Sequence, residues 1–324
     1  MLLVAGDIGG TKTLLSLYEK TGNQFDPLHS RRFNSGEYPT FDLVISEFIK
    51  EIDSNNISAL CLGIAGPVTQ QDNKYIAQAT NLPWKIDSYV LSQATGISNI
   101  ALINDFAAMG FGVSVMQEAD LLTLQRGQPQ QNTNRIVLGA GTGLGIAQLI
   151  SVDNQFSIVA SEGGHANFAP FDQTSAQLSQ YFIDKIGYCS IEHVLSGPGI
   201  TNIFEFITQH QGFDTSLDTH AEPATIANAY QSDEAARNTM DLFASIYGSV
   251  AGNLALTNLA FDGIYLTGGV AAKNSELLTK TPFIEAFHHK GKMSHLMPQF
   301  PIHIVTNEQC GLLGAAVAAS RLQT

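Results

Sequence analysis

Two glycine-rich segments of similar design constrain the fold of this chain more than any other feature. The first is GDIGGTKT at residues 6–13, and the second is GAGTGLG at residues 139–145. Each lies between two short apolar runs, so each predicts two strands joined by a glycine turn. A third strand is expected after each hairpin, at 28–33 and at 155–160. The repeat predicts two related α/β domains.

Helices and strands alternate along the rest of each half. The first half predicts a helix over 41–52, and the second half predicts a long, interrupted helical stretch over 174–260. The other expected elements are strands at 59–65, 99–103, 262–269 and 302–306 and helices at 87–95, 105–116 and 309–322. We predict an α/β fold with mixed sheets around an interdomain cleft. Residues 1–112 plus 307–324 form the small domain in this prediction, and residues 113–306 form the large one.

The charge and cysteine content argue against several classes of protein. The 324 residues carry 16 basic and 29 acidic side chains, giving a formal net charge of −13. Nucleic acids and anionic membranes bind clustered Lys and Arg, so we expect neither as a partner. No apolar run approaches the roughly 18 residues that span a bilayer. Cys61, Cys189 and Cys310 are few and scattered, which favours free thiols in a reducing cytoplasm.

The glycine loops have the composition of phosphate-binding loops. Glycines leave backbone amides accessible to phosphate oxygens, and Thr and Lys side chains add donors. The first loop lacks the spacing of a P-loop, and a strand follows it where a dinucleotide-binding motif has a helix. The carboxylate of Asp7 could meet a magnesium ion, directly or through water. LTGGVAAKN (266–274) is a third glycine turn, suited to a base and ribose. The alternative is that each loop is only a turn.

A polar pair follows the expected strand at 99–103. Asn104 and Asp105 come directly after an apolar run and before a helix. The strand would carry both side chains to the edge of a ligand site, where a carboxylate can act as a general base. The alternative is that Asp105 caps a helix starting at Phe106, which aspartate does well. The two roles are compatible.

Four further polar residues lie in segments that suit a sugar ligand. Glu162 and His165 flank two glycines and offer a carboxylate and an imidazole to sugar hydroxyls. Glu192 lies on a short helix before SGPG, and Asn81 lies in the turn TNLPW. The alternatives are a structural or metal-binding His165, a solvated or capping Glu192, and a turn that Asn81 merely stabilises.

Taken in series, these motifs resemble the bacterial glucokinase family of the zinc-free type, within the hexokinase–actin fold group. The motifs are GDIGGT at 6–11, INDF at 103–106, GAGTGLG at 139–145, EGGH at 162–165, EHVLSGPG at 192–199 and GLLGAA at 311–316. Their order and spacing cover nearly the whole chain. The resemblance implies two ribonuclease-H-like domains of the actin/hexokinase type. It implies no zinc, since the cysteine cluster of the related zinc-containing kinases and repressors is absent from the sequence.

The resemblance implies ATP-dependent phosphorylation of glucose to glucose 6-phosphate, with Asp105 as the catalytic base. The residues expected to bind the sugar are Asn104, Glu162, His165, Glu192 and Asn81. The residues expected to bind ATP are Gly6, Asp7, Ile8, Gly9, Gly10, Thr11 and Lys12 and, from the other domain, Thr142, Gly143, Gly268 and Gly269. Mg²⁺ would accompany ATP and meet Asp7 through water. The family is cytoplasmic and usually dimeric, so we expect a cytoplasmic homodimer.

Two departures and two rival functions stay open. Position 193 is His where the family usually has Arg, and position 167 is Asn where an acidic residue is common; neither is an expected ligand. One rival is a kinase for another hexose, such as fructose, mannose or an amino sugar. The other is a non-enzymatic regulator with an actin-like ATPase fold. The polar residues at 104–105 and 162–192 argue against the regulator, which needs no such pocket.

Overall fold

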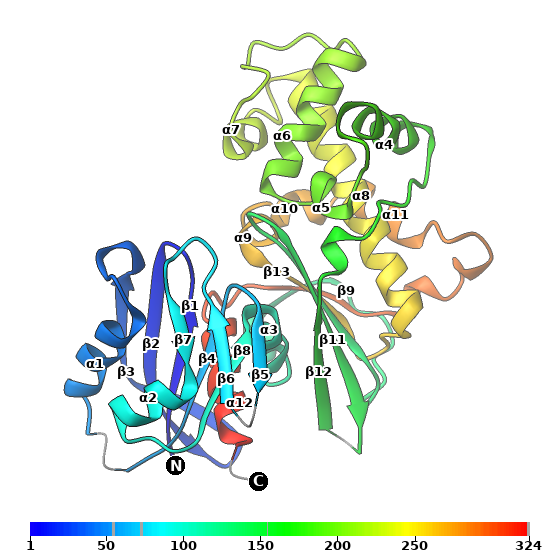
Figure 1. Cartoon of the computed structure of the whole chain (residues 1–324). Coiled ribbons are helices and arrows are strands. Elements are labelled where there is room, and N and C mark those ends of the chain that lie inside the picture. Colours follow the sequence, from blue (N-terminus) through cyan, green and yellow to red (C-terminus); the bar gives the residue numbers. More distant parts are fainter. Residues whose placement is uncertain (54–55, 72–73, 154, 323–324) are drawn as a thin grey trace. The chain divides into compact units, whose positions relative to one another are not determined.

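The chain folds into two compact units in the computed structural model, which describes residues 1–53, 56–71, 74–153 and 155–322 (Figure 1). Unit 1 contains Met1–Gln117 and Asn307–Thr324, and unit 2 contains Glu118–Thr306. The sequence predicts a boundary after residue 112, which falls within helix α3 (Asp105–Val113), whereas the units divide after Gln117.

A five-stranded mixed sheet forms the centre of unit 1. Its strands are β1 (Leu2–Ile8), β2 (Lys12–Thr21), β3 (Gln24–Asn34), β4 (Ile57–Ile64) and β8 (Ile100–Asn104). They lie in the order β3-β2-β1-β4-β8; β2 is antiparallel to both neighbours, and β1, β4 and β8 are parallel. Asp7 pairs with Gly63, and Ile64 pairs with Asn104. The carboxyl ends of the parallel strands therefore meet at one edge of the sheet.

Helices cover both faces of this sheet. They are α1 (Phe41–Lys50), α2 (Ser88–Thr95), α3 and α12 (Cys310–Ser320), with a short 3₁₀ turn, η1 (Ser35–Glu37). On one face, Leu3 of β1 and Cys61 of β4 share a core with Leu312 and Ala315 of α12. The core on the other face includes side chains of α1 and α2 and Trp84, the only tryptophan. Trp84 is 1% exposed and its indole donates to the carbonyl of Tyr38 at 2.9 Å.

A small antiparallel sheet in unit 1 is an addition to the predicted elements. It consists of β5 (Val68–Gln71), β6 (Lys74–Gln78) and β7 (Lys85–Asp87), between β4 and α2 in the chain. Gly66, just before β5, has a φ of +148°, and a Cβ there would lie 2.3 Å from the carbonyl oxygen of Gln78. These strands are three to five residues long and largely polar, which leaves too little hydrophobic periodicity to predict them.

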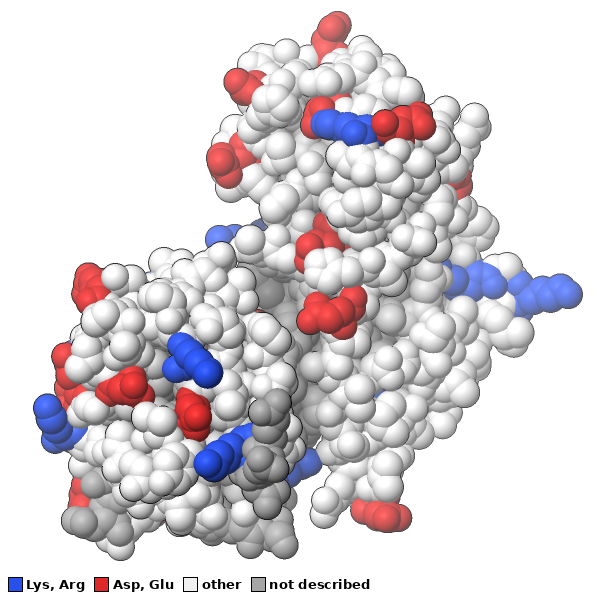
Figure 2. Space-filling view, in the orientation of Figure 1, with Lys and Arg blue, Asp and Glu red and all other residues white. Residues whose placement is uncertain are grey.

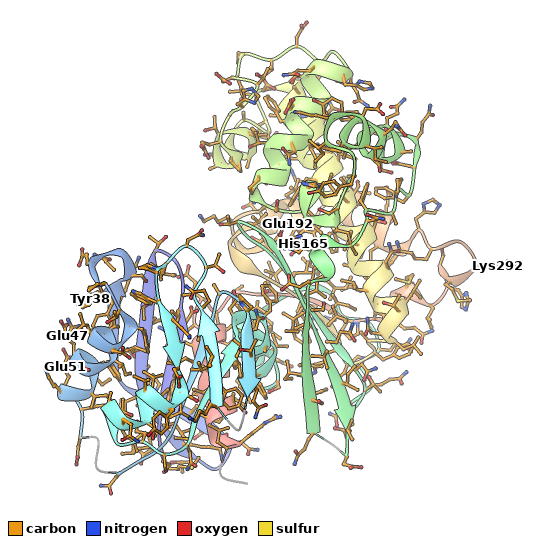
Figure 3. The ribbon with its side chains drawn as sticks, in the orientation of Figure 1. Tyr38, Glu47, Glu51, His165, Glu192 and Lys292 are labelled. Atoms are coloured by element: carbon orange, nitrogen blue, oxygen red, sulfur yellow. The ribbon has the colours of Figure 1, made fainter. Side chains whose placement is uncertain are left out.

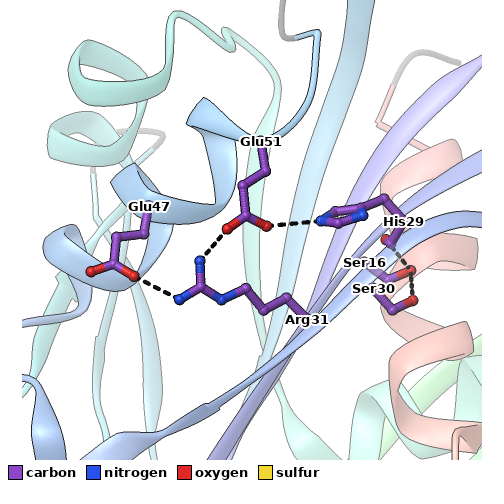
Figure 4. A network of polar contacts seen from close by, with 6 residues as sticks. All are labelled: Ser16, His29, Ser30, Arg31, Glu47 and Glu51. Atoms are coloured by element: carbon purple, nitrogen blue, oxygen red, sulfur yellow. Dashed lines mark hydrogen bonds and ion pairs between the residues drawn. The ribbon is translucent and has the colours of Figure 1, made fainter.

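Ion pairs fasten helix α1 to the edge strand β3 (Figure 4). Arg31 of β3 binds Glu47 at 2.9 Å and also binds Glu51. The Nε2 atom of His29 lies 2.9 Å from Oε2 of Glu51. Glu47 and Glu51 are one helical turn apart, so both carboxylates face β3. The hydrogen bond to His29 and then the bond to Arg31 lower the pKa of Glu51.

The sheet of unit 2 repeats the topology of the first. Its strands are β9 (Leu121–Gln125), β10 (Arg135–Ala140), β11 (Leu144–Val152), β12 (Gln155–Ser161), β13 (Ile264–Thr267) and β14 (Ile302–Val305). The order is β12-β11-β10-β13-β14-β9. Its first five strands have the same sequence of antiparallel and parallel pairings as β3-β2-β1-β4-β8, and β9 adds an antiparallel strand. The predicted α/β fold with mixed sheets and a repeated opening is confirmed.

Helices of unit 2 pack on its sheet around an aromatic core. They are α4 (Gln173–Ile186), α5 (Ile191–Val194), α6 (Gly197–Glu205), α7 (Pro223–Asn228), α8 (Glu234–Asn258), α9 (Gly268–Lys273), α10 (Ser275–Leu278) and α11 (Thr281–His288). The shorter turns are η3 (Glu118–Asp120), η4 (Gly163–His165), the π-helical η5 (Phe206–His210), η6 (Gly291–Met293) and η7 (Met297–Gln299). Tyr247 of α8 packs edge-on against Phe283 of α11 within this core.

Two predicted element ends are wrong. The sequence predicts a strand running into a glycine turn at 262–269, but β13 ends at Thr267 and helix α9 begins directly at Gly268. Gly268 has a φ of +83°, and a Cβ there would lie 2.5 Å from the carbonyl oxygen of Ala140, so glycine lets the chain turn tightly from strand to helix. The helix predicted over 105–116 ends at Val113.

Candidate active site

Asn104 and Asp105 lie at the carboxyl edge of the unit 1 sheet, where β8 meets α3. Oδ1 of Asn104 accepts hydrogen bonds from the amides of Phe106 at 2.9 Å and Ala107 at 3.4 Å. Asn104 therefore caps α3. Asp105 is itself the first helical residue, so the N-cap is Asn104 and not Asp105. Oδ1 of Asp105 nevertheless accepts a hydrogen bond from the amide of Phe106 at 2.9 Å. Its carboxylate sits where the positive end of the helix dipole favours negative charge.

Asp7 lies at the same edge of the sheet, on β1. Gly63 of the intervening strand lies beside α3: a Cβ there would lie 2.9 Å from Cβ of Ala108 and 3.9 Å from Cα of Asp105. The absence of a side chain at Gly63 thus lets α3 approach β4. Burial raises the pKa of Asp7, and the nearby charge of Lys12 opposes that rise. A cation at this carboxylate would offset the cost of its burial.

The first glycine loop is a closed turn between β1 and β2. The amide of Gly9 donates to the carbonyl of Lys12 at 2.9 Å. Ser35 of η1 anchors the loop from outside: its hydroxyl donates to the carbonyl of Gly9 at 2.9 Å, and its amide donates to the carbonyl of Thr11 at 3.0 Å. One serine, which is not among the predicted site residues, therefore binds the loop near both of its ends.

Asn81 lies against this loop. A Cβ on Gly10 would lie 3.4 Å from Cβ of Asn81 and 3.3 Å from the carbonyl oxygen of Thr80. Asn81 has a φ of +63°, a left-handed conformation that asparagine tolerates better than most residues. Asn81 therefore adopts a turn conformation, and this turn places it beside the first glycine loop, a predicted phosphate-binding loop.

Glu162, His165 and Glu192 come together in unit 2; Figure 3 labels His165 and Glu192, which lie close to each other. Nε2 of His165 lies 3.6 Å from Oε2 of Glu162, and its Nδ1 lies 3.8 Å from Oε1 of Glu192. Neither separation is a hydrogen bond. The side chain of His165 is 63% exposed, so it is not a buried structural histidine. The three side chains form a polar cluster that can exchange hydrogen bonds with hydroxyl groups.

Glu192 also binds the second glycine loop. Its Oε2 accepts a hydrogen bond from the amide of Leu144 at 2.7 Å. A Cβ on Gly143 would lie 2.6 Å from this same oxygen. The carboxylate therefore occupies the space that the missing side chain leaves. Glu192 is neither a solvated helix residue nor a cap, because its carboxylate is bound to the backbone of a different element.

A pocket of about 890 Å³ opens beside this loop within unit 2. Its lining residues come from the loop at 141–142, from α6, from the segment before and in α7, and from α9: Gly141, Thr142, Gly197, Pro198, Ile200, Thr201, Asn202, His220, Glu222, Pro223, Ala224, Ala227, Asn228, Gly269, Val270, Lys273 and Asn274. The predicted residues Thr142 and Gly269 thus line one pocket. Gly143 and Gly268 are their chain neighbours and are not among the lining residues.

Most polar side chains of this pocket are absent from the residues predicted to bind ATP. Lys273 and Asn274 belong to LTGGVAAKN, of which the sequence predicts only Gly268 and Gly269 as ligands. His220 and Glu222 lie in a segment between helices that carries no hydrophobic period. The motif LTGGVAAKN could have indicated Lys273 and Asn274. The sequence offers no such signal for His220 and Glu222.

The two departures from the family pattern lie side by side. Asn167 forms an isolated antiparallel bridge with Ser190. Nδ1 of His193 lies 3.1 Å from the amide and from the hydroxyl of the same Ser190, and its ring stacks on Phe182. His193 and Ser190 therefore form a capping box at the N-terminus of α5, the helix that carries Glu192.

The charged side chains are dispersed on the face that Figure 2 shows, where Asp, Glu, Lys and Arg are scattered among uncharged residues. Among residues 1–53, 56–71, 74–153 and 155–322, no group of three His, Cys, Asp or Glu side chains could hold a metal ion. Every helix in the described part of the chain is too short or too polar to cross a membrane.

Comparisons with known proteins identify the family of the chain. A family model described as Glucokinase matches residues 4–322. The glucokinase of Nostoc punctiforme is 39% identical, with 99% of each chain covered. The crystal structure of a glucokinase from an Antarctic psychrotroph has a TM-score of 0.90 and 28% identity, with 99% of each chain covered. That of a Balamuthia mandrillaris glucokinase in complex with glucose has the same fold, with a TM-score of 0.77, 21% identity, and coverage of 99% of this chain and 93% of that one. Motifs, sheet topology and similarity along the whole chain agree, and the chain belongs to the glucokinase family.

Proposed function

We propose that this enzyme transfers the γ-phosphoryl group of ATP to the 6-hydroxyl of glucose. The observation that carries the proposal is the contact between two sites in unit 2: Glu192 belongs to a polar cluster suited to a sugar, and it binds the loop that lines the pocket of about 890 Å³. Relatives named glucokinase along the whole chain support glucose as the acceptor.

The sugar hydroxyls would be held by carboxylate, imidazole and amide groups. Glu192, His165 and Glu162 provide acceptors and donors that are not already used on one another, because their mutual separations are 3.6 Å and 3.8 Å. Asn104 and Asn81 are the proposed contributions from unit 1. Since Oδ1 of Asn104 already accepts from two backbone amides, its amide group is the part we assign to the sugar.

Asp105 is the proposed general base. Phosphoryl transfer demands mainly positioning and charge neutralisation from a protein. The carboxylate would accept the proton of the 6-hydroxyl as the oxygen bonds to phosphorus and the bond to the leaving ADP breaks. Helix α3 and the packing at Gly63 fix the position of Asp105, and a general base of this kind contributes roughly 10²–10⁴-fold in rate.

The nucleotide would occupy the pocket of unit 2. Gly268 and Gly269 turn the chain at one wall, and Thr142 and Gly143 present the second loop to the phosphates. The first loop, with Gly6, Asp7, Ile8, Gly9, Gly10, Thr11 and Lys12, is the proposed second phosphate contact. Ser35 holds that loop closed, so its amides are already arranged before a ligand binds.

Mg²⁺ is the proposed companion of ATP. The donor chemistry at Asp7 fits it, because hard cations prefer carboxylate oxygens and a nearby cation would oppose the rise that burial causes in the pKa of Asp7. Asp7 would hold the ion through water. When bound, the ion neutralises charge on the β- and γ-phosphates.

The proposal extends to a cytoplasmic homodimer. Cys61, Cys189 and Cys310 are buried and are not joined by disulfides, as is usual in a reducing compartment. Sedimentation of the purified enzyme tests the dimer, and a sedimentation coefficient matching a single 34.8 kDa chain would contradict it.

A panel of sugars tests the proposed reaction. ADP release is measured with ATP and Mg²⁺, first without sugar and then with glucose, fructose, mannose or glucosamine. We expect glucose to give the highest kcat/KM. A higher value for another sugar would assign the enzyme to that hexose. Slow hydrolysis that no sugar accelerates would favour the non-enzymatic regulator.

A further inference from the structure

We infer that Glu192 is a positioning residue that couples sugar binding to nucleotide binding inside unit 2. The inference rests on the proposed function and adds to it a second task for a proposed sugar ligand. One carboxylate oxygen of Glu192 faces the polar cluster, and the other holds the glycine loop that lines the pocket. Occupancy of either site then changes the free energy of binding at the other.

The two oxygens of Glu192 have different neighbours. Oε2 accepts from the amide of Leu144 at 2.7 Å, whereas Oε1 lies 3.8 Å from Nδ1 of His165, beyond hydrogen-bond distance. Oε1 is therefore the oxygen that a sugar hydroxyl can engage. A hydroxyl that donates to Oε1 would fix the rotamer of Glu192 and thereby tighten the bond from Oε2 to the loop.

The carboxylate of Glu192 packs against the second glycine loop at Gly143, which has no side chain of its own. A Cβ on Gly143 would lie 2.6 Å from Oε2 and 3.4 Å from the carboxyl carbon of Glu192. The carboxylate thus lies directly against the backbone of Gly143. A shift of the Glu192 carboxylate would therefore shift residues 143–144, next to Thr142, and Thr142 and Gly143 are the proposed phosphate contacts of this loop.

A second connection joins the same two sites. Ser196, four residues after Glu192, donates its hydroxyl to the carbonyl of Glu192 at 2.8 Å and caps helix α6 by accepting from the amide of Gly199 at 3.0 Å. The amide of Gly197 donates to the carbonyl of Gly141 at 2.7 Å. Gly141 and Gly197 both line the pocket. The segment 192–199 therefore touches the glycine loop at two points, one on each side of Thr142.

Coupling of this kind is reciprocal. If glucose raises the affinity for a nucleotide by some factor, the nucleotide raises the affinity for glucose by the same factor. Such factors are typically about 5–150-fold. The contacts between segment 192–199 and the glycine loop lie wholly in unit 2. Substitutions at these contacts should therefore remove the coupling while both ligands still bind.

The test is calorimetric titration of the full chain with AMPPNP and Mg²⁺, with and without saturating glucose. For the parent enzyme we expect glucose to lower the Kd of AMPPNP by at least about 5-fold. Glu192→Gln has a single acceptor oxygen and cannot serve Leu144 and a sugar hydroxyl with separate oxygens. Gly143→Ala keeps every side chain of the cluster but displaces Oε2. In both variants the ratio of the two Kd values should fall to below about 2.

Glu162→Gln is the matched control. It makes the same chemical change in the same cluster, but the side chain of Glu162 is 88% exposed and lies 3.6 Å from Nε2 of His165. It should weaken glucose binding and keep the parent ratio. Unchanged ratios in both Glu192→Gln and Gly143→Ala would overturn the inference, as would independent binding of the two ligands to the parent. Failure of the parent to bind glucose at all would instead contradict the proposed function.

Discussion

Replacing Gly314 by alanine should push helix α12 away from helix α3 and destabilise unit 1. A Cβ on Gly314 would lie 1.7 Å from the carbonyl oxygen of Ala108 and 2.6 Å from the amide nitrogen of Gly112. Both atoms belong to the backbone of α3, so no side chain can rotate to make room. Since real Cβ atoms essentially never approach within 3.0 Å of another atom, the helices must separate by about 1 Å in a core packed at crystal density.

The expected loss follows from two opposing effects. Overpacking of this kind costs about 1–3 kcal/mol, and the higher helix propensity of alanine returns up to about 1 kcal/mol. We expect the free energy of unfolding of unit 1 to fall by about 1–2 kcal/mol. The substitution should also lower kcat if Asp105 is the proposed general base, because α3 begins at Asp105 and a displacement of about 1 Å in such a group can cost about 10²-fold.

Urea unfolding followed by tryptophan fluorescence measures this loss, because the only tryptophan, Trp84, lies in the core of unit 1. Gly311→Ala is the control in the same helix. A Cβ at Gly311 would meet only Cε of Met109, at 3.7 Å, so this variant should be neutral or slightly more stable. If Gly314→Ala unfolds at the same urea concentration as the parent, or if both variants shift alike, the close approach of the helices is not what positions α3.

The remaining predictions concern Asp105, Glu51 and Gly268. Asp105→Ala should lower kcat by at least about two decades and largely retain the calorimetric affinity for glucose; full activity would remove Asp105 from the reaction. The lowered pKa of Glu51 means that its bond to His29 stabilises unit 1 above the ordinary glutamate pKa of about 4.3 and that this contribution is lost as pH falls through the folded-state value. Glu51→Gln should therefore be less stable than the parent at pH 7 and equal to it well below pH 4 in Trp84 fluorescence, and a gap that persists there would contradict this. Gly268→Ala should lower the melting temperature and AMPPNP affinity, whereas Gly269→Ala, with nothing within 4 Å of its Cβ, should leave the melting temperature unchanged.

The fold could be predicted wherever the chain uses long apolar strands. The glycine hairpins at 6–13 and 139–145 gave the repeat, because apolar runs on both sides of a glycine turn have few other solutions. Strands β5, β6 and β7 could not be found this way, since they are short, and β9 is only partly buried. The sequence could not show that Asn104, and not Asp105, is the N-cap of α3, because both residue types cap helices well.

In the candidate site, contacts between residues near in sequence could be predicted, whereas contacts between distant residues could not. Glu162 and His165 are three residues apart, so a local pattern could pair them. The bond between Glu192 and Leu144 joins residues 48 apart in the chain, and only the packing of α5 against the glycine loop brings them together. His220 and Glu222, which line the pocket, could not be predicted either. They lie in an irregular segment, which has no hydrophobic periodicity from which its neighbours in space can be inferred.

Helix α12 belongs to unit 1, although unit 2 precedes it in the chain. It covers Leu3 and Cys61 in the core of unit 1. During synthesis, which proceeds from the N-terminus, the sheet of unit 1 must wait with one apolar face uncovered until all of unit 2 has been made. Unit 2 can complete its own core first. We therefore expect nascent chains that stall before α12 to be bound by chaperones through the exposed face of β1 and β4, and the emergence of α12 to be the step that commits unit 1 to its native state.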